Sequence, residues 1–174
     1  CSTGTYQPYS GQSSCLDADA GYYTDTTASV SQTACAAGTY QPSTGQTSCI
    51  DASAGYYVDT TAAISQTACT AGTYNANTGS TSSSACLDAD AGYYVPNTGS
   101  ASQTACAAGT YQPSTGQTSC IDASPGYYVD TTAATSQTAC AAGTYNSNTG
   151  STSSSACLDA DAGYYVPSTG SASQ

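Results

Sequence analysis

The sequence lacks every positively charged side chain, and it also lacks Glu, Met, Trp and Phe. Its only charged side chains are 11 Asp, which give a net charge of -11, and all 16 of its aromatic residues are Tyr. Without Lys or Arg no basic surface can form, so nucleic acid is excluded as an electrostatic partner. Without His or Lys, and with the cysteines expected in disulfides, no nucleophile and base can be paired. We therefore expect no enzyme activity and no cofactor.

Large aliphatic residues are also scarce, which limits the hydrophobic core that the chain can form. Burying so little apolar surface cannot offset a backbone ordering cost of about 1 to 2 kcal/mol per residue. Composition alone would indicate disorder, but the 10 cysteines indicate a fold held by disulfides, as in small extracellular domains. Thiols that are free or bind metal are the alternative, although CxxC and His, the usual zinc ligand patterns, are absent. The sequence therefore predicts an extracellular or cell-surface protein.

No apolar run approaches the roughly 20 residues that a membrane-spanning helix requires, and no signal peptide is present. The chain starts at Cys1 without a Met and stops at Gln174, where the repeat would next read Thr-Ala-Cys. We therefore expect the sequence to be a window from a longer mature protein.

The chain is a tandem repeat, and the spacing of its cysteines defines five repeat units. The gaps between successive cysteines run 14, 20, 14, 20, 17, 20, 14, 20 and 17. The third and fifth units carry three extra residues in an Asn-rich loop. Units two and three match units four and five with a period of 71 residues. The predicted boundaries of the units are 1–34, 35–68, 69–105, 106–139 and 140–174. Repetition of a short module favours extended surface over a single catalytic pocket.

Each repeat unit divides into two halves of about 17 residues with the common pattern [C/A]-x-x-G-[T/Y]-Y. The first half opens and closes with Cys, as at Cys35 and Cys49, whereas the second half has Ala52 and Gln66 at these positions. Because the two cysteines are lost together, we predict that they form a disulfide with each other. In the chain-entropy model each such disulfide adds about 3 kcal/mol to the free energy of unfolding. The predicted pairs are Cys1/Cys15, Cys35/Cys49, Cys69/Cys86, Cys106/Cys120 and Cys140/Cys157. The alternative is pairing between neighbouring units, such as Cys15 with Cys35.

The fold predicted from these halves is all-β, small and disulfide-rich. Gly-Thr-Tyr and Gly-Tyr-Tyr favour short strands, and Pro-Ser-Thr-Gly favours a β-turn between them. Each half then forms one hairpin, and hairpins that are marginal alone must stack into an elongated rod or solenoid-like array. A Tyr in each half provides a flat surface for stacking, with a sugar-binding face as the alternative role. These residues are Tyr6, Tyr23, Tyr40, Tyr57, Tyr74, Tyr94, Tyr111, Tyr128, Tyr145 and Tyr165.

The run CAAGTYQPSTGQTSCIDASAGYY, which begins at Cys35, resembles the ephrin-receptor-like cysteine-rich repeat of extracellular proteins. The similarity covers all five units. It implies small disulfide-linked hairpins that act in structure, adhesion or recognition. The chain departs from the family where a further Cys is usual. These positions are Ala18, Ala52, Ala89, Ala123 and Ala160.

Alternating carboxylates before a Gly occur three times and resemble part of a calcium-binding loop, because calcium takes several oxygen ligands. The candidate ligands are Asp17, Asp19, Asp88, Asp90, Asp159 and Asp161. Two other units have Ser53 and Ser124 at the second position of the pair, and no bidentate Glu follows. Solvated or turn-capping Asp is the alternative. Paired carboxylates also occur in glycoside hydrolases, but repetition across units argues against that activity.

The chain contains no Asn-x-Ser/Thr sequence for N-glycosylation, but its Ser and Thr cluster in turns near Pro. This pattern is typical of extracellular stalks with O-linked glycans, and a plain polar loop is the alternative. The candidate sites are Ser43, Thr44, Thr60, Thr61, Ser82, Ser83, Ser114, Thr115, Thr131 and Thr132.

Two hypotheses for function follow. Near-identical modules without cationic side chains can associate with open symmetry and make filaments, so the first is a structural subunit of an extracellular fibre, appendage or cell coat. Its partners would be copies of itself and glycans. The second is a monomeric cysteine-rich rod of a surface receptor or coat antigen that binds a ligand.

Overall fold

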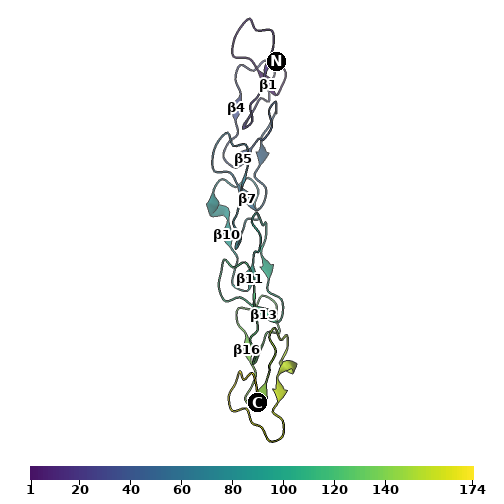
Figure 1. Cartoon of the computed structure of the whole chain (residues 1–174). Coiled ribbons are helices and arrows are strands. Elements are labelled where there is room, and N and C mark those ends of the chain that lie inside the picture. Colours follow the sequence, from purple (N-terminus) through teal and green to yellow (C-terminus); the bar gives the residue numbers. More distant parts are fainter. The chain divides into compact units, whose positions relative to one another are not determined.

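The computed structural model describes all 174 residues, and its regular structure is a series of two-stranded antiparallel hairpins (Figure 1). Every strand is two residues long. The expected all-β, disulfide-rich series of tandem hairpins is confirmed. The pairs are β1 (Thr5–Tyr6) with β2 (Leu16–Asp17), β3 (Tyr22–Tyr23) with β4 (Thr33–Ala34), β5 (Thr39–Tyr40) with β6 (Ile50–Asp51), β7 (Tyr56–Tyr57) with β8 (Thr67–Ala68), β9 (Thr73–Tyr74) with β10 (Leu87–Asp88), β11 (Tyr93–Tyr94) with β12 (Thr104–Ala105), β13 (Thr110–Tyr111) with β14 (Ile121–Asp122), β15 (Tyr127–Tyr128) with β16 (Thr138–Ala139), and β17 (Thr144–Tyr145) with β18 (Leu158–Asp159).

We call each half of a repeat unit a module. Each of the nine hairpins corresponds to one module, and the tenth module, which was also expected to form a hairpin, has no paired strands. Odd-numbered modules contain two cysteines and are called disulfide modules, and even-numbered modules are called cysteine-free modules. The 3-10 helices η1 (Ser83–Ala85) and η2 (Ser154–Ala156) lie in the longer loops of modules 5 and 9. The modules, in order, are residues 1–17, 18–34, 35–51, 52–68, 69–88, 89–105, 106–122, 123–139, 140–159 and 160–174.

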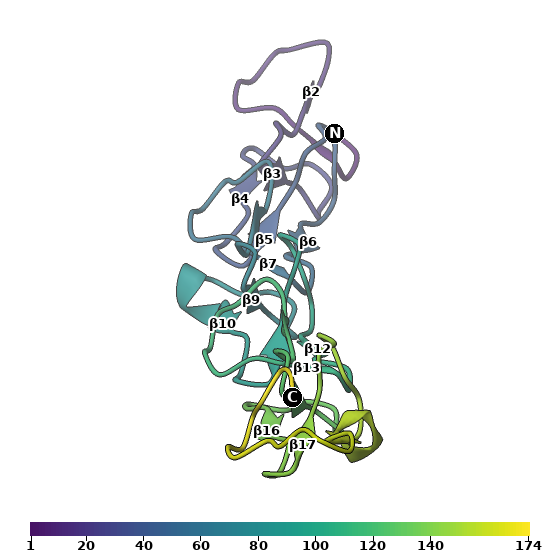
Figure 2. The ribbon, with the colours of Figure 1, turned by 60° about the horizontal axis from the view of Figure 1, so that its bottom comes forward.

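The chain divides into two compact parts, and each is described by itself. The first comprises Cys1–Thr70, Tyr74–Leu87 and Thr98–Ser102, and the second comprises Ala71–Thr73, Asp88–Asn97 and Gln103–Gln174. In the first part, β3 lies beside β4 and β5 beside β6, as the antiparallel registers require (Figure 2).

The tight turn of each module comes before its first strand. The N–H of Tyr56 donates to the carbonyl of Ser53 at 3.0 Å, and Gly55 between them has φ of +87°. A positive φ at this position is typical of a type II turn, which also favours Pro one residue earlier. Module 8 has Pro125 there. The expected β-turn at residues 42–45 lies instead inside a longer loop, residues 41–49, which joins β5 to β6.

Main-chain hydrogen bonds join each module to the next one. In the first part, the N–H groups of Gly21 and Thr24 donate to the carbonyls of Gln41 and Gln46 at 2.8 and 3.1 Å. A bond from the later module back to the earlier one is also present, because the N–H of Gly45 donates to the carbonyl of Ala18 at 2.7 Å. The second part has the same set of bonds between modules 6 and 7. There the N–H groups of Gly92, Val95 and Gly116 donate to the carbonyls of Gln112, Gln117 and Ala89, respectively. Backbone groups that a lone hairpin would leave to solvent are therefore paired with the adjacent module.

The core consists of two positions, the first and seventh residues, in each of modules 2–9. In the first part, the buried first residues are Ala18, Cys35, Ala52 and Cys69, and the buried seventh residues are Thr24, Gln41, Val58 and Asn75. These side chains are small or polar, so their burial removes little apolar surface from water. Disulfides and hydrogen bonds must therefore supply much of the stability of the fold.

The fourth residue of every module is a Gly, and in modules 1–8 its α-carbon faces the main chain two modules later. A Cβ placed on Gly38 would lie 2.5 Å from the carbonyl oxygen of Gly79, closer than two such atoms can approach. A Cβ placed on Gly79 would meet nothing within 4 Å. The equivalent of Gly79 is Ala in modules 2, 4 and 8, with φ of 55–56° at Ala28, Ala62 and Ala133. The contact therefore excludes a side chain at Gly38 only.

We expect Gly38→Ala to destabilise the fold much more than Gly79→Ala, although both glycines have positive φ. A left-handed conformation costs an L-residue about 1 to 2 kcal/mol, and only Gly38→Ala adds a collision with the main chain. Denaturant unfolding of the disulfide-intact variants would measure the difference. Equal losses of stability would show that the approach of Gly38 to Gly79 is not a constraint.

Candidate functional site

The five disulfides each close one disulfide module. Their Cα–Cα separations are 5.6–5.8 Å, and no cysteine is free. This is the pairing that the joint loss of two cysteines predicts, and the alternative pairing between neighbouring units is not formed. The pairs are Cys1–Cys15, Cys35–Cys49, Cys69–Cys86, Cys106–Cys120 and Cys140–Cys157.

In the cysteine-free modules a Gln side chain closes the same loop by hydrogen bonds. The amide oxygen of Gln103 accepts from the N–H of Asp90 at 2.7 Å, and its amide nitrogen donates to the Asp90 carboxylate at 2.6 Å. Gln32 makes the same pair of bonds with Asp19, and Gln174 makes it with Asp161. The Gln that stands where the second cysteine is lost therefore links the two ends of the loop.

The two cysteine-free modules that have Ser in place of Asp keep the main-chain bond of this pair. Gln66 accepts from the N–H of Ser53, and Gln137 accepts from the N–H of Ser124, both at 2.7 Å. The Ser53 hydroxyl accepts a longer bond of 3.4 Å from Gln66. The main-chain bond is thus common to all five cysteine-free modules, and the carboxylate strengthens it in three of them.

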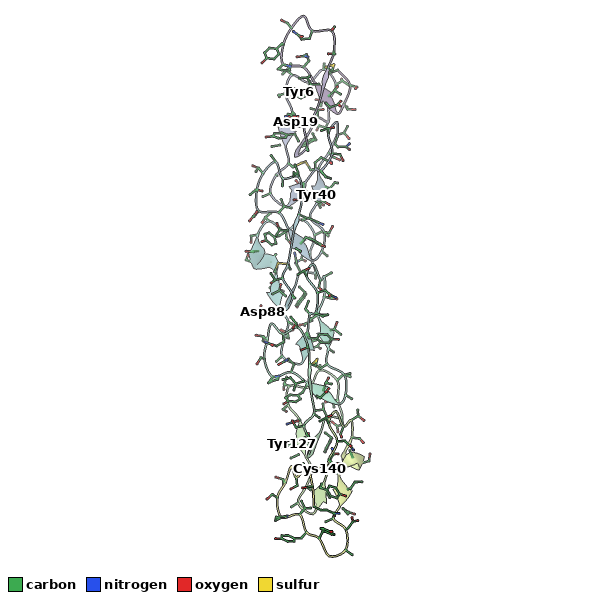
Figure 3. All side chains as sticks on the ribbon, viewed as in Figure 1. Tyr6, Asp19, Tyr40, Asp88, Tyr127 and Cys140 are labelled. Carbon is green, nitrogen blue, oxygen red and sulfur yellow. A yellow bond between two sulfur atoms is a disulfide. The ribbon has the colours of Figure 1, made fainter.

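The Asp residues predicted as calcium ligands make two different kinds of contact. Asp19, Asp90 and Asp161 bind the Gln amides, whereas the carboxylates of Asp17 and Asp88 lie near Gly45 and Gly116 two modules later. Asp159 is exposed on β18 (Figure 3 labels Asp19 and Asp88). No group of three or more His, Cys, Asp or Glu side chains is placed to hold a metal ion. Calcium binding stays a prediction.

Buried Gln and Asn side chains shape the loops of the disulfide modules. The amide of Gln41 donates to the carbonyl of Ser48 and accepts from the N–H of Ser43, at 2.9 and 3.1 Å. In module 5, which has the longer loop, Asn75 donates to the carbonyl of Tyr56 and to the Ser80 hydroxyl. No buried side-chain polar atom lacks a partner. The signal in the sequence is that Gln accompanies the shorter loop and Asn the longer one.

Nine of the ten predicted stacking tyrosines lie in the first strand of a module, as Tyr6 and Tyr40 do (Figure 3), and these nine are half-buried. Tyr165 in module 10 is exposed and lies in no strand. Two other tyrosines, Tyr56 and Tyr127, each precede a stacking Tyr in a cysteine-free module and pack more closely against the main chain. A Cβ built on Gly99 would lie 2.7 Å from the Tyr56 hydroxyl, and one on Gly170 would lie 2.8 Å from that of Tyr127. These rings therefore pack over the main chain two modules later.

Two equivalent grooves open between a cysteine-free module and the next disulfide module. The first is about 520 Å³ and the second about 480 Å³. Each combines one Tyr ring, Tyr23 or Tyr94, with Thr and Ser hydroxyls and a disulfide. Both lie at the same repeat positions, one in each compact part. The shared lining is Tyr23, Thr33, Ala34, Ala36, Thr39, Ser48 and Cys49 in one, and Tyr94, Thr104, Ala105, Ala107, Thr110, Ser119 and Cys120 in the other.

Nine of the ten O-glycan candidates are exposed, as the modification requires. Thr60 and Thr61 in module 4 and Thr131 and Thr132 in module 8 lie on equivalent loops. Ser82 is half-buried and caps η1, where its side-chain oxygen accepts from the N–H of Ser84. Ser82 is therefore the candidate least suited to carry a glycan.

No helix in the structure has the length and apolar character needed to cross a membrane.

Comparison with protein families places three segments of the chain in a known family. The model of the family described as tyrosine-protein kinase ephrin type A/B receptor-like matches residues 1–35, 33–69 and 92–140. These segments cover more than half of the chain and agree with the resemblance noted from the cysteine pattern. A search of curated proteins finds no match.

The shared geometry of the two kinds of module predicts that a cysteine pair can replace the Gln contact. We expect Ala52→Cys with Gln66→Cys to form a sixth disulfide, because these residues occupy the positions of Cys35 and Cys49. In the chain-entropy model this disulfide would raise the free energy of unfolding by about 3 kcal/mol. Thiol titration and unfolding with and without reductant would measure it. The single Gln66→Cys variant is the control, and two free thiols in the oxidised double variant would refute the equivalence.

Proposed function

Because the chain belongs to the tyrosine-protein kinase ephrin type A/B receptor-like family of cysteine-rich repeats, we propose that it is an extracellular structural protein. Its copies build or coat a filament, appendage or cell coat, and its exposed loops carry O-linked glycans. The family and the five disulfides indicate an extracellular or cell-surface location. Disulfides form and persist in that oxidising environment.

The observation that carries this proposal is that every module bonds to the next through the same main-chain groups. The Gly N–H to carbonyl bond from module to module is 2.7–2.8 Å throughout. Since these bonds use the main chain and not a particular side chain, modules can be added with little new sequence. Such a chain gains length and repeated surface, which are the properties that a filament or coat needs.

The alternative is a monomeric surface protein that binds a ligand, and the two equivalent grooves favour it. The lining that they share, a Tyr ring and hydroxyl groups, is neutral, and the first groove has in addition the Asp25 carboxylate in its lining. A Tyr ring and several hydroxyls can stack on and hydrogen-bond a neutral ligand. In this case the repeat would display the same groove more than once along one molecule.

Electron microscopy of the native material, with antibody labelling of the chain, discriminates the two functions. The structural proposal expects labelled fibres or a coat with a repeat that is a multiple of the two-module unit. Reduction of the disulfides should disperse the material, because the modules lose their covalent closure. Labelled single particles that do not associate would contradict the structural function and support the monomeric alternative.

The glycan part of the proposal is tested by mass spectrometry of native peptides released by cleavage before Asp. We expect the peptides that contain Thr60 and Thr61, or Thr131 and Thr132, to exceed their sequence masses. Chemical removal of O-glycans should return them to those masses. Peptides with unmodified masses before treatment would show that the hydroxyls are bare.

A further inference from the structure

The largest aliphatic side chains of this protein lie on its surface. The chain has three Leu and three Ile, and all six are exposed, by 44–58%. The buried positions are occupied by Cys, Ala, Val and polar residues. Folded proteins usually bury Leu and Ile, whereas none of these residues is in the core of this chain.

Five of these six residues occupy one repeated position, directly after the second cysteine of each disulfide module. We call them the aliphatic row. In the first compact part the row comprises Leu16, Ile50 and Leu87, and in the second it comprises Ile121 and Leu158. Their exposed fractions fall in the narrow range of 44–54%. The row is therefore a regular feature of the surface and not a scatter of single residues.

The hairpin geometry places each row residue beside a Tyr and away from the neighbouring carboxylate. Leu16 is opposite Tyr6 and Ile50 is opposite Tyr40 in the antiparallel registers. Residues that are directly opposite share a face of the hairpin, and successive residues face opposite sides. The Asp that follows each row residue, such as Asp51, therefore points to the other face. Each disulfide module presents an apolar patch free of its own strand carboxylate.

Hairpin formation does not require the aliphatic residue at this position. Four cysteine-free modules, numbers 2, 4, 6 and 8, have Thr there. The register is the same, because Thr33 is opposite Tyr23 and Thr67 is opposite Tyr57. The three additional residues of module 5 lie in the loop that contains η1, before the row residue. The row thus keeps its place on the hairpin in long and short modules alike. Exposed apolar residues that recur at the same position of successive modules give a repeat protein a repeated contact surface.

We propose that the aliphatic row is the side-to-side contact between copies of this chain, with the row of one copy packed on the row of the other. This inference rests on the proposed structural function and specifies its lateral contact. A second copy has the same spacing of row residues, so one register can bring the successive residues of a part into contact together. A partner without this period would engage single residues only. Once one pair of row residues is in contact, the next pair is held close together at a high effective concentration. The successive contacts therefore strengthen the association of the two copies.

Charge also favours a second copy with an apolar contact. The chain has no cationic side chain and a net charge of -11, so two copies cannot associate through salt bridges. Their carboxylates repel each other unless they are screened or held apart. A contact made by the face opposite to the strand carboxylates meets this requirement. Association should therefore strengthen as salt concentration rises.

The test replaces the row by the residue that the chain itself uses in its cysteine-free modules. The variant is Leu16→Thr, Ile50→Thr, Leu87→Thr, Ile121→Thr and Leu158→Thr. The control, Val30→Thr with Ile64→Thr, removes exposed aliphatic side chains outside the row, and module 8 already has Thr135 at the position of Ile64. Circular dichroism and the absence of free thiols would establish that each variant has the native fold.

Sedimentation velocity of the disulfide-intact chains over a range of protein and salt concentrations measures the association. We expect the wild type and the control to associate with dissociation constants within about twofold of each other, and the row variant to associate at least tenfold more weakly. Equal association of the folded row variant would overturn the row as the interface while leaving the filament proposal to the electron microscopy. A wild type that stays monomeric at every concentration would also overturn it. Row-dependent flotation of a monomeric chain with phosphatidylcholine vesicles would assign the row to a lipid surface instead.

Discussion

The structure depends on main-chain hydrogen bonds between consecutive modules, and the glycines that permit them set the limits on the sequence. Gly21 donates to Gln41 in the next module, while its α-carbon faces the main chain of module 4 with no space for a Cβ. A module thus contacts both its neighbour and the module beyond. Because the interactions are those of the backbone, the side chains between the glycines can change with little effect on how modules join.

Closure of the loops alternates between covalent and hydrogen-bonded forms, and this alternation explains how few cysteines are sufficient. The disulfide of Cys35 and Cys49 restricts the unfolded chain, which a hydrogen bond cannot do. The bonds of Gln66 instead contribute only in the folded state. Each cysteine-free module lies next to modules with a disulfide, and it bonds to them through its main chain. The disulfides therefore stabilise modules that do not contain them.

The repeat, the hairpin of each module and the disulfide pairing could be predicted from the sequence, because each leaves a trace in the pattern of residues. Cys35 and Cys49 vary together, and short β-favouring segments recur with them. The role of Gln66 could not be predicted. The sequence shows only that a cysteine is replaced, whereas the bond depends on where the N–H of Ser53 lies. The loop at residues 41–49 was also missed, since its conformation is set by the buried amide of Gln41 and not by Pro and Gly alone.

The distribution of side chains follows from the closeness of the modules. Where main chains approach as closely as those of Gly38 and Gly79, the buried side chains are Ala, Cys, Val, Thr, Asn and Gln. All the Leu and Ile side chains lie outside this core. Their retention at one position of every disulfide module, where Thr33 shows that a polar residue is accepted, points to a requirement on the surface. The compact interior of the chain and the exposure of its Leu and Ile side chains thus arise from the same constraint.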